Sequence, residues 1–188
     1  SGVPSVGAES IVGLGIHDFS KTKYVPREYF DAMKRGHIQD RDVLLYKDGG
    51  KPGQFEPHAT LVGEGFPFAE CAINEHVYRV RVIPALGQPY LYFWLSSDTA
   101  MAEMRNRGTG VAIPGLNSTQ VRSLAILVSS EGAVERFEQV CSALLSRIFV
   151  NCVQSRSLAA GRDALLPQLV SGQFGSRGTD HEEAAPIS

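Results

Sequence analysis

The feature that most constrains this chain is a stretch after Gly132 that contains neither glycine nor proline until Gly161. One stripe runs through it in alternating steps of three and four residues, and it consists of Val134, Phe137, Cys141, Leu144, Ile148, Asn151, Ser155, Leu158, Arg162, Leu165 and Leu169. Eight of these eleven residues are apolar. Such spacing is typical of a coiled-coil seam, so it predicts one long helix.

The length of this helix makes a partner necessary. At about 1.5 Å per residue it spans roughly 55 Å, which is more than a small domain covers, so we expect its stripe to pack on a second helix from another chain. Polar seam residues such as Asn151 often fix the register of a coiled coil. Gly161 predicts a locally less stable point in the helix, and Pro167 predicts a kink or the end of the helix. The residues that we assign to the partner interface are Val134, Phe137, Cys141, Leu144, Ile148, Asn151, Leu158, Leu165 and Leu169.

The rest of the chain predicts one small domain. A length of 188 residues allows one domain plus an appendage, and 43% apolar residues indicate a folded core. Glycine and proline recur between short apolar runs up to residue 130, which is typical of strands and turns. We expect strands at residues 42–46, 71–82, 110–113 and 124–128, and helices at 27–34 and 89–105. The predicted class is α+β, with a globular domain at 1–130, the long helix at 131–171 and a flexible tail at 172–188.

Composition also limits the setting and the partners. The cysteines Cys71, Cys141 and Cys152 are an odd number without a C-x-x-C pair, which argues against a disulfide framework and a zinc finger. No apolar run approaches the roughly 20 residues that cross a bilayer. We therefore expect a soluble, cytoplasmic protein with no membrane partner. The net charge of −2 by itself gives no sign of affinity for polyanions.

The search for catalytic chemistry finds no convincing motif. Residues 13–15 lack the third glycine of a dinucleotide loop, and residues 49–52 carry proline where a phosphate loop needs a hydroxyl residue. An Asn-Pro-Pro-aromatic signature of amino-methylating enzymes is absent. On one strand, Cys71 and His76 would lie on opposite faces, and Glu56 with His58 would be two metal ligands without a third. We expect no catalytic residue, metal or cofactor in this chain; a small hydrolase using Cys71 or a histidine is an alternative without motif support.

Basic residues in predicted loops are the better candidates. Lysine, arginine, threonine and asparagine there could reach phosphates or base edges, and nearby glycines let the backbone approach a phosphate. The other interpretation is that these charges are simply solvated, because residues 1–128 hold 13 bases and 13 acids. The candidate DNA-binding residues are Lys21, Lys23, Lys47, Lys51, Arg105, Arg107, Thr109 and Asn117.

Four segments, in order, resemble one known family. They are residues 2–11 (GVPSVGAESI), 41–49 (RDVLLYKDG), 108–117 (GTGVAIPGLN) and 155–172 (SRSLAAGRDALLPQLVSG). Each is similar to an element of the specificity subunit of type I restriction-modification enzymes, and the last is the most specific. The resemblance spans nearly the whole chain.

The resemblance implies a target recognition domain with a curved β-sheet, followed by a helix that pairs antiparallel with a second such helix. Full-length members hold two recognition domains that each read half of a split target in double-stranded DNA. Methyltransferase subunits dock around them and methylate adenine with S-adenosylmethionine, and a restriction subunit with motor activity joins for cleavage. This chain has one domain and one helix, so a twofold homodimer would restore both. The alternative is a scaffold or decoy that pairs with a full-length specificity subunit or a methyltransferase without reading DNA.

Overall fold

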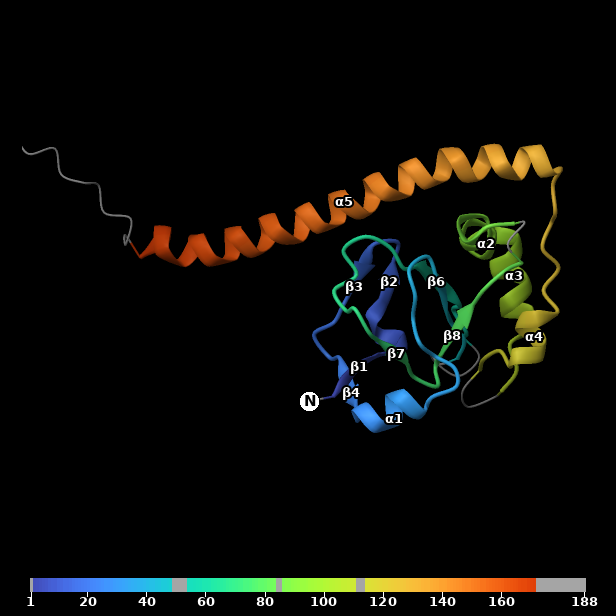
Figure 1. The fold of residues 1–188 in the computed structure, drawn as a ribbon, viewed down its shortest axis with the longest axis horizontal. Helices are drawn as coiled ribbons and strands as arrows, with labels where there is room; N and C mark the ends of the chain where they lie inside the picture. The colour runs from blue at the N-terminus through green and yellow to red at the C-terminus, as the bar shows by residue number, and fades with distance from the viewer. Residues whose placement is uncertain (1, 49–53, 84–85, 111–113, 172–188) are drawn as a thin grey trace, which may run out of the picture. The chain divides into compact units, whose positions relative to one another are not determined.

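The structure, a computed structural model, describes residues 2–48, 54–83, 86–110 and 114–171. It is a mixed α+β fold with small β-sheets and a long C-terminal helix, which confirms the predicted class at this level (Figure 1). Its strands are β1 (Val3–Val6), β2 (Ile11–Gly13), β3 (Ile16–His17), β4 (Lys23–Val25), β5 (Val43–Tyr46), β6 (His58–Leu61), β7 (Ala72–Ile73) and β8 (Val77–Val80). Its helices are η1 (Ala8–Ser10, a 3-10 helix), α1 (Arg27–Ala32), α2 (Gln88–Leu95), α3 (Asp98–Arg107), α4 (Ser118–Arg122) and α5 (Glu131–Val170).

The chain divides into two compact units, residues 1–152 and 153–188, so the boundary falls inside α5. The first unit contains all the strands, the shorter helices and the first part of α5. The described part of the second unit is the remainder of α5 and residue 171. The predicted tail at 172–188 lies outside the described residues.

Strand β5 is the centre of the first unit. It pairs antiparallel with β6 on one side and β8 on the other, in the order β6-β5-β8. Val43 and Leu45 belong to one apolar core, whereas Leu44 between them belongs to a second core. Alternate side chains of a strand point to opposite faces, so this strand is buried on both faces. A continuous run of apolar residues is the sequence pattern of such a strand.

A second small sheet lies beside this one. It has the order β4-β1-β7, in which β1 is antiparallel to β4 and parallel to β7. Val3 of β1, Phe30 of α1 and Ala72 of β7 form a third apolar cluster. Helix α1 therefore covers the sheet that carries the N-terminus (Figure 1). Strands β2 and β3 form a separate hairpin.

The first part of α5 completes the main core. Leu145 and Phe149 are fully buried there, together with residues of β5, β6 and α2. A Cβ atom added to Gly63 would lie 2.2 Å from the Phe149 ring, so only glycine permits this approach. The domain thus covers this part of α5 through Leu145 and Phe149, two residues outside the predicted stripe.

Two further contacts bind α5 to α2. The Phe137 ring packs edge-on against the rings of Tyr90 and Phe93, with centroids 5.4 and 5.8 Å away. The backbone N–H of Tyr90 donates to Glu138 Oε1 at 2.8 Å, which satisfies an unpaired N–H in the first turn of α2. Burial raises the pKa of Glu138 in spite of that hydrogen bond.

The helix predicted at residues 89–105 is two helices. Helix α2 ends at Leu95, and α3 begins at Asp98. Ser97 lies between them, and its Oγ accepts a hydrogen bond from the N–H of Ala100 at 3.3 Å. Serine is a favoured N-cap and residues 96–99 are all polar, so the break between the two helices is encoded locally.

Two predicted strands also differ in the structure. The strand predicted at 71–82 is two short strands, β7 and β8, with a turn at residues 74–76 between them. Residues 124–128 form no strand: Leu124 and Ile126 pack on the core, and Tyr90 Oη donates to the Leu127 carbonyl at 2.6 Å. Their apolar alternation is satisfied by packing alone. The strand predicted at 110–113 falls on residues 111–113 outside the described part.

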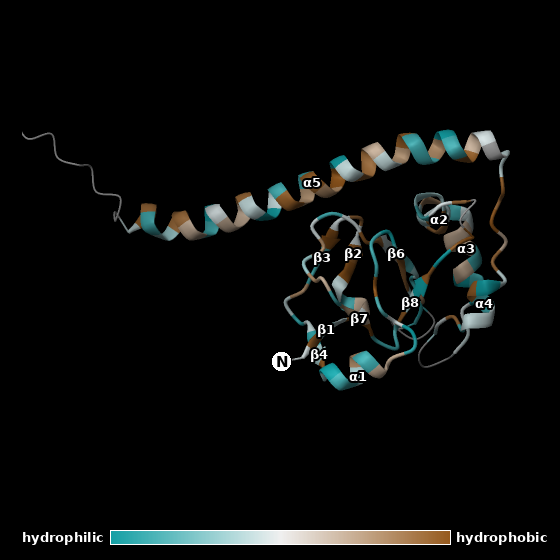
Figure 2. Ribbon diagram, in the orientation of Figure 1, coloured by the Kyte–Doolittle hydropathy of each residue, from teal (hydrophilic) through white to brown (hydrophobic). Residues whose placement is uncertain are grey.

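No helix in the described part of the chain is both long and apolar enough to span a membrane. Figure 2 shows why for α5, because hydrophobic and hydrophilic residues alternate along the ribbon.

We predict that Phe149→Ala lowers the free energy of unfolding by about 3–5 kcal/mol, the usual cost of emptying a buried phenylalanine site. Leu158→Ala is the control, because Leu158 lies on the same helix but is 75% exposed, and it should change that free energy by less than about 0.5 kcal/mol. Urea unfolding followed by circular dichroism measures both. Equal effects of the two substitutions would contradict the assignment of Phe149 to the domain core.

Candidate nucleic-acid interface

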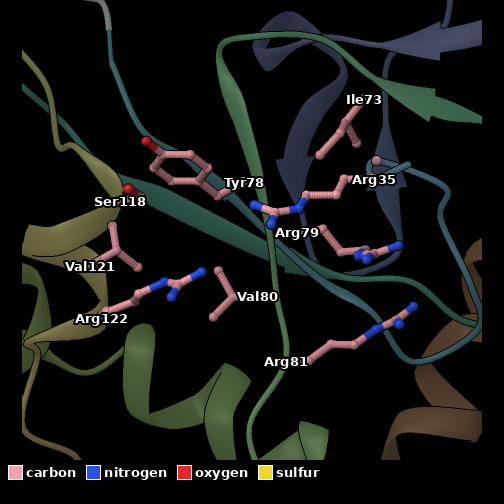
Figure 3. A pocket seen from close by; sticks show the side chains of 10 residues that line it. Arg35, Ile73, Tyr78, Arg79, Val80, Arg81, Ser118, Val121 and Arg122 are labelled. Atoms are coloured by element: carbon pink, nitrogen blue, oxygen red, sulfur yellow. The ribbon is translucent and has the colours of Figure 1, made fainter. Parts of the chain in front are cut away.

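The described residues form a basic groove of about 540 Å³. Four arginines line it, together with Tyr78 and Ser118 (Figure 3). They are Arg35 after α1, Arg79 in β8, Arg81 just beyond β8, and Arg122 in α4. No described residue that lines the groove is acidic. We call this surface the arginine groove.

The position of β8 explains why the groove forms. Strand β8 is last in the order β6-β5-β8, so within the described ranges one side of it has no neighbouring strand. Tyr78 and Val80 pack on the main core, and the alternation of the strand directs Arg79 to the opposite face. Charged residues are frequent on edge strands because they prevent pairing with another chain. Helix α4 and the residues after α1 then supply the other walls.

Two of the arginines are held by the protein. Arg81 Nη2 donates to Asp42 Oδ2 at 2.9 Å, and Arg81 Nε donates to the other oxygen of that carboxylate. The Asp42 side chain is only 2% exposed whereas that of Arg81 is 40% exposed, so the pair joins a buried carboxylate to a partly exposed guanidinium. The hydrogen bond from Arg81 to Asp42 raises the pKa of Arg81. Arg79 donates to the carbonyl of His37, so its guanidinium is also fixed.

The other two arginines lack such partners. Among the residues that the structure describes, neither Arg35 nor Arg122 forms an ion pair or a side-chain hydrogen bond. Figure 3 shows their guanidinium groups pointing into the groove from opposite sides. A guanidinium offers five N–H donors in a planar fork that suits phosphate oxygens and guanine edges. The groove therefore presents two guanidinium groups without such partners among the described residues, in addition to two that are fixed, which is an arrangement suited to a polyanion.

The predicted DNA-binding residues lie elsewhere, and most have partners within the protein. Lys21 is in an exposed turn, Lys23 is exposed in β4, and Lys51 lies outside the described residues. Arg105 pairs with Glu56 at 2.6 Å, and Arg107 pairs with Glu103 on its own helix. Of these residues, the four that the structure describes do not line the arginine groove.

Lys47 lies beside a residue of the groove. Its Nζ lies 5.2 Å from the centroid of the Tyr78 ring, and Tyr78 lines the groove. The same Nζ donates to Asp48 Oδ2 at 2.8 Å. Asp48 also accepts from His76 Nδ1 at 2.7 Å, and although burial opposes it, these partners lower the pKa of Asp48.

Thr109 and Asn117 have structural roles in the described chain. Thr109 exchanges two backbone hydrogen bonds of 2.9 Å with Gly115, which closes a loop. Asn117 is the N-cap of α4, where its Oδ1 accepts from the N–H of Gln120 at 2.9 Å and Gln120 Oε1 accepts from the N–H of Asn117 at 2.8 Å. This capping box occupies the Asn117 side chain, because its acceptor oxygen is already used.

The sequence reasoning missed Arg35, Arg79, Arg81 and Arg122. The signal for two of them was present, because residues 76–82 alternate and place Arg79 and Arg81 on one face of a strand. Arg35 and Arg122 had no local signal, since they are 87 positions apart in the sequence and only the fold brings them to one groove.

The histidines and the cysteine considered for catalysis and metal binding have structural surroundings in the domain. Cys71 is buried, and burial raises the pKa of its thiol to about 12. His76 contacts Asp48, and His58 Nδ1 lies 3.3 Å from the carbonyl of Glu56. Within the described ranges, no cluster of three or more histidine, cysteine, aspartate or glutamate side chains could hold a metal ion.

Helix α5 carries a second candidate surface. Val134, Phe137 and Cys141, which we assigned to a partner interface, pack on the chain's own domain. Asn151, the polar residue assigned to that interface, is exposed. The apolar seam residues that stay exposed are Leu144, Ile148, Leu158, Leu165 and Leu169, and we call them the α5 stripe. Leu145 and Phe149, the deepest contacts with the domain, lie beside this stripe rather than in it.

No family model matches the sequence, and no curated protein matches it either.

We predict that Arg81→Ala destabilises the protein by about 3 kcal/mol, because it leaves the Asp42 carboxylate buried without its cation. Arg122→Ala is the matched control from the same groove and should change the free energy of unfolding by less than about 0.5 kcal/mol. Both are measured by urea unfolding at pH 7. If Arg122→Ala destabilised as much as Arg81→Ala, the division into fixed and free arginines would be wrong.

Proposed function

We propose that this chain is a non-catalytic DNA-recognition subunit of a type I restriction-modification system, which reads one half of a bipartite target. The arginine groove is the observation that carries this proposal. Its described lining has four arginines and no acid in a chain whose net charge is −2, so the local charge differs sharply from the average. Phosphate contacts supply most of the affinity for DNA, and arginine is the residue that most often reads guanine in the major groove.

The groove supports a division of roles among its arginines. Arg79 and Arg81 are held by protein acceptors and would offer a fixed positive surface to the phosphate backbone. Arg35 and Arg122 are free to adjust to a bound strand. Tyr78, which also lines the groove, offers an aromatic face that a base or sugar can contact. In this proposal the domain is the target recognition domain, and adenine methylation with S-adenosylmethionine is performed by a methyltransferase partner, with a restriction subunit joining for cleavage.

The α5 stripe supports self-association. The seam is symmetric about Val153, because an antiparallel copy of α5 would place Ile148 against Leu158 and Asn151 against Ser155. Next to the twofold axis the pairing is apolar at Ile148 and Leu158, and the polar residues Asn151 and Ser155 flank the axis, where each finds a partner. Leu144 would lie beside the aliphatic stem of Arg162. A dimer of this kind would carry two recognition domains, as full-length specificity subunits do.

The alternative is a scaffold or decoy whose helix pairs with a full-length specificity subunit or a methyltransferase without reading DNA. The same α5 stripe favours it, since helix pairing does not require the groove. The two functions differ in whether the arginine groove binds DNA.

We predict that the chain binds a labelled 20-bp random-sequence duplex weakly at low salt, and that Arg35→Ala/Arg122→Ala raises the Kd about tenfold. The slope of log K against log salt should fall by about 2, since two phosphate contacts are lost. Fluorescence anisotropy between about 50 and 200 mM salt measures both quantities.

The control for the DNA experiment is Arg27→Ala/Arg162→Ala, which removes the same charge from exposed arginines outside the groove. Equal losses in the two double variants would show a general charge effect and would favour the scaffold. Selection of bound duplexes from a random library then tests whether binding is sequence-selective.

We predict that the wild-type chain dimerises at micromolar concentration and that Leu158→Asp makes it monomeric, because a charge would be buried in the helix pair. Ser157→Asp is the control, as it adds the same charge outside the stripe. Sedimentation equilibrium gives the mass, and thermal unfolding checks that the domain is intact. A wild-type monomer, or a dimer that survives Leu158→Asp, would contradict pairing through the stripe.

A further inference from the structure

Arg41 has an unusual backbone conformation. Its φ is 61°, and among the described residues it is the sole non-glycine residue with positive φ. L-residues with a side chain rarely adopt this left-handed form, and it persists only where surrounding contacts impose it. The N–H of Arg41 donates to the carbonyl of Val62 at 3.1 Å, and its own carbonyl accepts from Gln88 Nε2 at 3.1 Å.

The side chain of Arg41 reaches α5. Its guanidinium carbon lies 5.4 Å from the centroid of the Phe149 ring, and its Nη2 donates to Glu64 Oε1 at 2.9 Å. Ser146 Oγ of α5 donates to the same carboxylate oxygen at 2.9 Å. Although burial opposes it, hydrogen bonds from the backbone, Ser146 and Arg41 lower the pKa of Glu64. We call Arg41, Glu64, Ser146 and Phe149 the helix clamp.

The next residue along the chain, Asp42, connects this turn to the arginine groove. Asp42 is buried and accepts two hydrogen bonds from Arg81, which lines the groove. One peptide bond therefore links Arg41, whose side chain contacts α5, to Asp42, whose side chain holds Arg81. A change of the Arg41 backbone to a negative φ would turn this peptide and move the Asp42 carboxylate.

We propose that Arg41 is a positioning residue for the arginine groove. By binding α5 its side chain keeps the turn in the left-handed form, and that form places Asp42 to hold Arg81. Arg41 Nη1 is buried without a hydrogen-bond acceptor among the described residues. This unpaired donor costs free energy and lowers the cost of separating the Arg41 side chain from α5. The groove is therefore fully assembled only while α5 is docked on the domain.

The test compares Arg41→Ala with Arg41→Gly, which remove the same charge and the same clamp. Glycine adopts positive φ without strain, whereas alanine does not. The proposal expects Arg41→Gly to keep Asp42 and Arg81 in place and Arg41→Ala to release them. The direct readout is the hydrogen-exchange rate of the Arg81 side-chain Nε–H, measured by NMR. This rate should match the wild type in Arg41→Gly and rise at least tenfold in Arg41→Ala. Equal protection in the two variants would overturn the proposal.

Binding of the 20-bp duplex provides a second readout, and only this one rests on the proposed function. The Kd should rise about twofold for Arg41→Gly, from the loss of charge, and about five- to tenfold for Arg41→Ala. If the wild type does not bind DNA, the proposed function fails while the NMR comparison still decides the role of Arg41.

In Glu64→Ala, the direction of the change in DNA affinity distinguishes a positioning role of the helix clamp from a general charge effect. It removes an acid, so a general charge effect would strengthen DNA binding, whereas release of the clamp should weaken it about threefold. Glu64 is about half exposed, so the variant should fold. The control is Glu70→Ala, which removes an exposed carboxylate paired with Arg27. Tighter binding by Glu64→Ala, or a fully protected Arg81 signal in it, would overturn the proposal.

Discussion

Leu145 and Phe149 of α5 fill the centre of the main core, and the other features of the first unit depend on this packing. The Phe149 ring lies against the backbone of Gly63, where any side chain would collide with it. The same ring faces the guanidinium of Arg41, so one aromatic side chain closes the core and anchors a polar contact. Interiors are close-packed, and a ring of this size has few alternative positions. The first part of α5 is therefore a structural part of the domain as well as a connection to a partner.

The arginine groove follows from a different constraint, the pairing of a buried carboxylate. Asp42 must have a cation because an isolated charge in the interior is very costly. Arg81 supplies it from the end of an edge strand, and this places a fixed guanidinium at the groove. Arg35 and Arg122 then complete the basic surface from two other elements. The pairing of the buried Asp42 carboxylate with Arg81 thus sets part of the geometry of the surface that we propose binds DNA.

The sequence predicted the elements better than the site. Residues 43–46 and the long helix were recognised because their apolar patterns are local and strong. The candidate Asn117 was chosen for its chemistry, but its position three residues before Gln120 makes a capping box, a local pattern that could have been recognised. Arg105 was chosen for its place beside a loop, and its partner Glu56, 49 positions away, was not predictable from spacing.

The sequence alone determined that this chain forms an α+β domain and a long helix, because helix and strand periodicity depend on neighbours within a few residues. It also indicated an apolar seam on that helix. Only the tertiary structure decided which side of α5 enters the core, since Leu145 and Phe149 compete with a stripe of similar hydrophobicity on the next face. The tertiary structure also decided which arginines converge, because Arg35, Arg79 and Arg122 meet only when the sheet and the helices have packed.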